Sequence, residues 1–194
     1  MPDSLRTRPL PELDVEDGNR PPRPDLGDVA PAQRRAGQHL AAIHRHYLHD
    51  LARIAQVMQR IAAGDAPPSE LAHIVINAEM AQNFRAFGTI CGQQCRVLGM
   101  HHDIEEQSIF PQLHARGAPA LRAVVERLRA EHAVVHELLD RLAAQAQRLT
   151  ADPSEASFAE ATAIFERLLA VVRSHFHYEE TTLEEALGVH GVMV

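Results

Sequence analysis

The 194-residue sequence has few cysteines, no long apolar run and no basic stretch, and each absence argues against a class of protein. The net charge is −7 and the acidic residues are spread along the chain, so no basic stripe is present to neutralise nucleic-acid phosphates. No run approaches the roughly 20 apolar residues that span a bilayer. Residues 1–30 also lack the apolar centre of a secretory signal peptide. We therefore expect a cytoplasmic protein that binds neither nucleic acid nor membranes.

The two cysteines, Cys91 and Cys95, lie four residues apart in one predicted helical stretch, where a disulfide would cross-link little. They form neither a disulfide framework nor a Cys-x-x-Cys redox motif. We interpret them as small, reduced, buried residues, with an additional thiol function as the alternative.

The chain divides into a proline-rich N-terminal tail and a helical region. Residues 1–30 combine prolines with charges and have no apolar period, so we expect a disordered or loosely ordered tail. Over residues 31–194, apolar residues recur at alternating spacings of three and four, which indicates amphipathic helices. Breaks near Gly64, Gly117 and Asp152 separate four helical stretches, and we expect Asp152 to cap the last one. The predicted fold class is all-α, an antiparallel four-helix bundle after the tail.

Every predicted helix carries at least one histidine on its apolar face. Residues four apart lie side by side on a helix, so a histidine and a glutamate at that spacing can bind one metal ion. The inward candidates are His44 on the first helix, His101 and Glu105 on the second, His132 and His136 on the third, and His175 and Glu179 on the fourth. Burying a carboxylate costs on the order of several kcal/mol unless it is paired or metal-bound. The converging side chains therefore predict a metal site.

The helical period leaves some assignments open. His102 and Glu106 have the same spacing as His101 and Glu105, and His39 is a reserve candidate on the first helix. Four further glutamates lie beside the expected inner line, where we expect them either on the solvated surface or hydrogen-bonded behind the ligands. They are Glu106, Glu131, Glu137 and Glu180. The alternative interpretation of the whole pattern is a structural bundle with inert core histidines.

The donor types favour iron over zinc. Five histidines and two carboxylates exceed the needs of one tetrahedral zinc ion, and sulfur is not evidently involved. Two iron ions bridged by the two carboxylates fit the count. Ferritin-like di-iron bundles use Glu-x-x-His, whereas here the histidine comes first and the spacing is four.

At these residues the sequence resembles the hemerythrin family, in particular the bacterial hemerythrin-like HHE cation-binding domain. The resemblance covers roughly residues 38–187 and is carried by the segments HHDIEEQSIFP, RAEHAVVHELL and SHFHYEE. It implies the ligands His44, His101, Glu105, His132, His175 and Glu179, with the two glutamates bridging. The family's spacing from the glutamate to Phe110 and Pro111 selects His101 and Glu105 over the neighbouring pair. His136 matches a paired histidine of oxygen-carrying hemerythrins and is included, and Glu184 and Glu185 replace an expected Phe-Pro.

The resemblance implies a non-haem di-iron protein that binds or senses oxygen or nitric oxide. Because family members share ligands and differ in activity, a di-iron enzyme that decomposes hydrogen peroxide or reduces nitric oxide is the alternative. The expected partners are a diatomic ligand or peroxide and a redox partner of unknown identity. We expect an apolar shell around the centre that keeps water away, formed by Leu98, Leu128, Leu168 and Val172.

Overall fold

The computed structural model describes residues 3–15, 17–63, 65, 93–151 and 154–194. All regular elements within these ranges are helical, which confirms the all-α prediction. The long elements are α2 (Arg35–Ala62), α5 (Gln93–Ile104), the π-helical turn η4 (Glu105–Ile109), α6 (Phe110–Arg116), α7 (Pro119–Ala151) and α8 (Glu155–Val189). The short elements are α1 (Asp3–Arg6), η1 (Leu10–Glu12), η2 (Asp17–Asn19) and η3 (Pro31–Arg34). No helix in these ranges is both long and apolar enough to cross a membrane.

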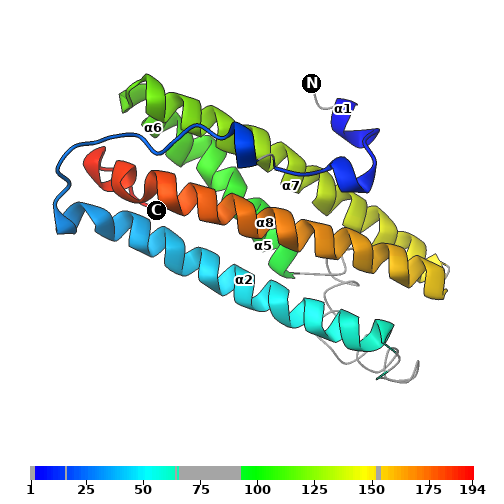
Figure 1. The fold of residues 1–194 in the computed structure, drawn as a ribbon. Coiled ribbons are helices and arrows are strands. Elements are labelled where there is room, and N and C mark those ends of the chain that lie inside the picture. The colour runs from blue at the N-terminus through cyan, green and yellow to red at the C-terminus, as the bar shows by residue number, and fades with distance from the viewer. Residues whose placement is uncertain (1–2, 16, 64, 66–92, 152–153) are drawn as a thin grey trace.

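Helix α8 lies between α2 and α7 and packs along both of them. Figure 1 shows that α8 runs in the opposite direction to each of these neighbours, while the α5, η4 and α6 segment lies alongside them. The described helices thus form a bundle. The full four-helix antiparallel arrangement stays a prediction, because residues 66–92 lie outside the described ranges, as does Cys91.

The apolar stripes that predicted the helices form the core. On α8, the positions Phe165, Leu168 and Val172 are fully buried, and His175 and Glu179 continue the same face with no exposed surface. Burying a Phe or Leu side chain contributes about 1.5–3 kcal/mol, so repeated burial along this face offsets the cost of placing polar groups on it. The same stripe therefore supports the fold and positions the candidate ligands.

The start of α8 differs from the prediction. Its N-cap is Ser154, whose Oγ accepts a hydrogen bond from the Ser157 backbone N–H at 3.2 Å. The predicted cap, Asp152, is therefore wrong by two residues. Proline is tolerated in the first helical turn, so Pro153 permits a helix that starts on either side of it, and the sequence alone did not distinguish the two caps.

A π-helical turn, which begins at the candidate ligand Glu105, interrupts the predicted second helical stretch. In η4, the Phe110 backbone N–H donates to the Glu105 carbonyl, five residues earlier. Pro111, in the first turn of α6, has no N–H to donate to the carbonyl four residues before it, and its ring crowds that carbonyl. A wider turn relieves this crowding, and such turns are frequent at functional sites.

The N-terminal tail lies along α7 and α8 (Figure 1). Leu13 and Val15 are buried and belong to the same apolar cluster as the residues of α8. Arg167 donates to the Leu13 carbonyl at 2.9 Å, and Arg141 donates to the Leu5 carbonyl at 2.9 Å. The described part of the tail is thus ordered by the bundle, since it has no core of its own. The division of the chain after residue 30 stays a prediction.

Candidate metal centre

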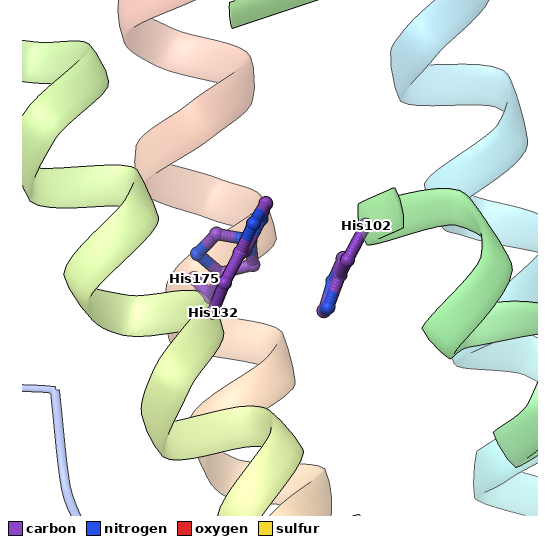
Figure 2. A group of neighbouring side chains, drawn as sticks. All are labelled: His102, His132 and His175. Carbon is purple, nitrogen blue, oxygen red and sulfur yellow. The ribbon is translucent and has the colours of Figure 1, made fainter. Parts of the chain in front are cut away.

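Two adjoining groups of buried side chains lie in the interior of the bundle. The His/Glu group consists of His44, His101, Glu105 and Glu179, and the three-histidine group consists of His102, His132 and His175. Within each group, one nitrogen or oxygen atom of every residue lies within 4.8 Å of those of the others. Figure 2 shows the three-histidine group, whose members come from α5, α7 and α8.

The spacing within the His/Glu group suits donors around one ion. His44 Nε2 lies 3.0 Å from His101 Nε2 and 3.6 Å from Glu179 Oε2. His101 Nε2 lies 3.1 Å from Glu105 Oε1. Donors that each lie about 2.1 Å from a metal ion are about 3.0–3.4 Å apart when they are neighbours around it. The observed separations are close to that range.

The two carboxylates connect the groups. Glu105 directs Oε1 toward His101, while its Oε2 lies 3.4 Å from His132 Nε2 in the other group. Glu179 Oε2 lies 3.7 Å from His175 Nε2, which is close to its distance from His44. Each carboxylate therefore faces histidines of both groups.

Apart from His44 Nε2 and His101 Nε2, which lie at hydrogen-bond distance from each other, several inward atoms of this cluster have no hydrogen-bond partner within the described ranges. They are both ring nitrogens of His102, Nε2 of His132 and His175, and both carboxylate oxygens of Glu105 and Glu179. Leaving a buried polar group unsatisfied costs about 1–3 kcal/mol, and more if it is charged. Imidazole nitrogens and carboxylate oxygens are iron ligands, so bound cations would satisfy these atoms. The residues present therefore fit a metal centre.

The surroundings hold the imidazoles in the form that binds metal. Burial, together with nearby His44 and His175, lowers the pKa of His101 to about 3. Burial and neighbouring imidazoles likewise lower the pKa of His102 and of His132 well below the ordinary value. The pKa of Glu105 is raised well above its ordinary value by burial and by the nearby carboxylate of Glu179. A cation would offset that repulsion and favour the ionised carboxylate.

Three of the histidines are held from behind by carboxylates. The Nδ1 atoms lie at hydrogen-bond distance from an outer oxygen: His44 to Glu180 at 3.1 Å, His132 to Glu106 at 3.0 Å and His175 to Glu131 at 3.1 Å. An Nδ1–H that donates to a carboxylate orients the ring and leaves Nε2 free to bind metal. Of the two positions expected for these glutamates, the solvated surface or hydrogen-bonded behind the candidate ligands, the structure shows the hydrogen-bonded one.

The remaining flanking glutamate, Glu137, accepts a hydrogen bond from Arg141 Nε at 2.7 Å on the same helix. The three outer carboxylates differ in exposure: the Glu180 and Glu106 side chains are 29% and 32% exposed, whereas Glu131 is 1% exposed. Glu180 lines a surface groove between α2 and α8. Of these outer carboxylates, Glu180 and Glu106 are therefore accessible to water, whereas Glu131 is not.

Glu131 is buried among cations, and one of them comes from the tail. Arg20 donates to both of its oxygens, at 2.8 and 2.9 Å, and Arg127 donates at 2.8 Å. Burial alone would raise the pKa of Glu131, but the hydrogen bonds from His175, Arg20 and Arg127 lower it to about 2. The Arg20 guanidinium also lies 4.6 Å from the centre of the Tyr178 ring. No periodicity or motif in the tail pointed to Arg20.

The structure brings together six of the seven candidate ligands. His136 is partly exposed and belongs to neither group, and the reserve candidate His39 is exposed on α2. Of the two possible pairs, whose histidines lie on α5 and whose glutamates lie on η4, His101 and Glu105 both belong to the His/Glu group, as the family spacing implied. His102 is also part of the cluster, in the three-histidine group, although the helical period offered it only as an alternative to His101.

The fold and the site together define a helical bundle whose buried histidines and glutamates could hold metal ions. The profile of the hemerythrin HHE cation binding domain matches residues 35–187, and the chain belongs to this family. No curated protein and no solved structure shows a significant match to the chain. The matched region contains every candidate ligand and begins after Arg20.

Proposed function

We propose that the chain holds two iron ions in a carboxylate-bridged centre and uses them to bind or sense oxygen or nitric oxide. The observation that supports this most is the position of Glu105. Its two oxygens face different histidine groups, His101 at 3.1 Å and His132 at 3.4 Å. A carboxylate that faces two sets of imidazoles is arranged to bridge two ions.

In this proposal His44 and His101 hold one ion, His132 and His175 hold the other, and Glu105 and Glu179 contact both. Iron would supply a redox couple and a coordination position for a diatomic ligand. The residues of the chain hold the ions, fix the orientation of the rings through the outer carboxylates and exclude water. The predicted ligand His136 is not part of this donor set, because it belongs to neither group of donor atoms.

The groups around the centre make it dry. The Phe176 ring stacks on His44 with centroids 3.7 Å apart, and the Phe110 ring stacks on His132 at 5.2 Å. The four residues expected to form an apolar shell are all fully buried: Leu98, Leu128, Leu168 and Val172. A dry, apolar setting limits side reactions of a small ligand with water, which suits reversible binding.

The test is rapid mixing of the reduced, iron-loaded protein with oxygen or nitric oxide while its absorption spectrum is recorded. The proposal predicts a spectral change that reverses when the gas is removed. Irreversible oxidation without a reversible phase would contradict it. Release of many oxygen equivalents per site from hydrogen peroxide, lost in His175→Ala, would instead identify the enzyme alternative.

A further inference from the structure

We propose that His102 binds the same metal ion as His132 and His175, so that two consecutive histidines of α5 serve two different ions. This inference rests on the proposed di-iron centre and extends it by one ligand. It gives His102 the place that the sequence assigned to His136.

The first observation is the burial of His102. Its side chain has no exposed surface, and neither ring nitrogen has a hydrogen-bond partner in the part of the chain that the structure describes. The three histidines with outer carboxylates have one nitrogen satisfied, whereas His102 has none. A buried imidazole in this state is unfavourable unless something binds it. A metal ion would satisfy one of its nitrogens.

The second observation is the arrangement of the three rings. His102 stacks on His132 with centroids 4.1 Å apart, and its ring stands at 81° to that of His175 with centroids 5.4 Å apart. In Figure 2 the His102 ring extends from α5 into the space between the helices, opposite the rings of His132 and His175. One nitrogen of each lies within 4.8 Å of the others. Imidazole binds metal through a lone pair in the plane of its ring, so these three side chains can bind a single divalent ion when the stacked rings of His102 and His132 turn their nitrogens toward it.

The position of α5 explains how adjacent residues reach different ions. This helix contacts both α2 and α7. Consecutive residues on an α-helix point about 100° apart, so one can face each neighbour. His101 meets His44 of α2 at 3.0 Å, and His102 meets His132 of α7.

His136 is less well placed for the same role. It lies one turn after His132 on α7, is partly exposed, and has its ring centroid 6.4 Å from that of His132. Its Nε2 atom is buried without a hydrogen-bond partner among the described residues, and its ring is stacked with that of His102 at a centroid distance of 5.5 Å. It belongs to no group of donor atoms found in the described ranges.

The proposed donor set makes the two ions unequal. With His102, one ion has three imidazoles, while the other has two, and the bridging carboxylates contribute to both. The ion held by His44 and His101 then has fewer protein donors.

The test compares His102→Ala with His136→Ala and with the wild-type full chain after anaerobic loading with ⁵⁷Fe. Iron per chain and the Mössbauer spectrum are measured, and circular dichroism checks the fold. We expect His136→Ala to keep both ions. We expect His102→Ala to bind the second ion at least about tenfold more weakly and to show a mononuclear iron signal. His102→Gly with added imidazole separates lost ligation from disturbed packing, and we expect the added imidazole to restore the second ion.

The outcomes separate the two proposals. If His102→Ala keeps both ions with an unchanged spectrum, the role of His102 is overturned and the di-iron proposal stands. If imidazole fails to restore the second ion to a helical His102→Gly protein, the role of His102 is likewise overturned. If the wild type binds no iron, the di-iron proposal falls and the role of His102 falls with it.

Discussion

At the scale of single residues, the centre depends on which atom of each imidazole faces inward. The outer carboxylates of Glu106, Glu131 and Glu180 accept from Nδ1 and leave Nε2 directed at the site. Glu131 differs from the other two because it is buried and is itself held by Arg20 and Arg127. The rigidity of His175 therefore depends on a chain of contacts that begins in the tail.

Glu131→Gln tests this chain of contacts. The amide keeps the shape but removes the charge that His175 and the two arginines bind, so we expect iron affinity to fall about 10–100-fold. Competition with a chelator of known affinity measures the change. Glu137→Gln is the matched control, because within the described residues Glu137 pairs with Arg141 and with no candidate ligand. Equal affinities for the two variants would show that Glu131 does not orient a ligand.

Acid should release the iron. Metal binding requires neutral imidazoles and ionised carboxylates, so protons compete for the ligands, and we expect steep loss below about pH 5–6. Iron retained after dialysis at stepped pH measures it, and full retention at about pH 3 would contradict the ligand set.

The metal-free protein should also lose stability in acid. The folded-state pKa of His101 is about 3, and those of His102 and His132 are also lowered. Between the ordinary histidine value near 6.5 and these lowered values, the unfolded chain binds protons that the folded chain does not. The free energy of unfolding therefore decreases as the pH is lowered through this range, by up to about 1.4 kcal/mol per pH unit for each histidine. The raised pKa of Glu105 acts in the opposite sense, but it is one group against three. Urea unfolding at stepped pH measures the sum.

The sequence predicted most of the centre at this scale, because a polar residue on an apolar helical stripe is conspicuous. It did not predict that His101 and His102 would both face inward. A periodic pattern assumes that a helix has one buried face, whereas α5 contacts two helices. Arg20 could not be predicted at all, since its partner Glu131 is distant in sequence.

At the scale of elements, the long helices follow their apolar stripes. The predicted break near Gly117 is confirmed by the start of α7 at Pro119, whereas the cap of α8 and the π-helical turn were missed. Both missed features lie next to a proline in the sequence, Pro153 or Pro111. A proline alone does not specify where a helix begins or where a turn becomes wider. An apolar stripe predicts well which face of a helix is buried. It predicts less well where a helix begins or where a turn becomes wider.

The close approach of α2 and α8 depends on Gly37. A Cβ atom at this position would overlap the backbone of Glu184 on α8. We expect Gly37→Ala to lower the free energy of unfolding by about 1–3 kcal/mol, because the helices must move apart. Chemical denaturation measures it. Gly99→Ala is the control: a Cβ there meets nothing within 4 Å, so that variant should be neutral or up to about 1 kcal/mol more stable.

At the scale of the whole molecule, the bundle and its centre are interdependent. The interior contains buried groups that favour the fold only when they are satisfied, so metal that binds the folded state should stabilise it. The tail adds Leu13 to the apolar core and Arg20 to the outer layer of the centre. The sequence suggested a loosely ordered tail because its composition gives no core of its own. The composition of the tail could not show that its apolar residues pack into the core of the bundle.

The central claim is a pair of iron ions bridged by Glu105 and Glu179. The most direct measurement is iron per chain together with the near-ultraviolet bands of the oxidised protein, for the wild type, Glu105→Ala, Glu179→Ala and Glu106→Ala. The account predicts two ions per wild-type chain, loss of iron and of the bands in Glu105→Ala and Glu179→Ala, and little change in Glu106→Ala, whose carboxylate lies behind His132. Two retained ions and an unchanged spectrum in both bridge variants, with loss in Glu106→Ala, would contradict it.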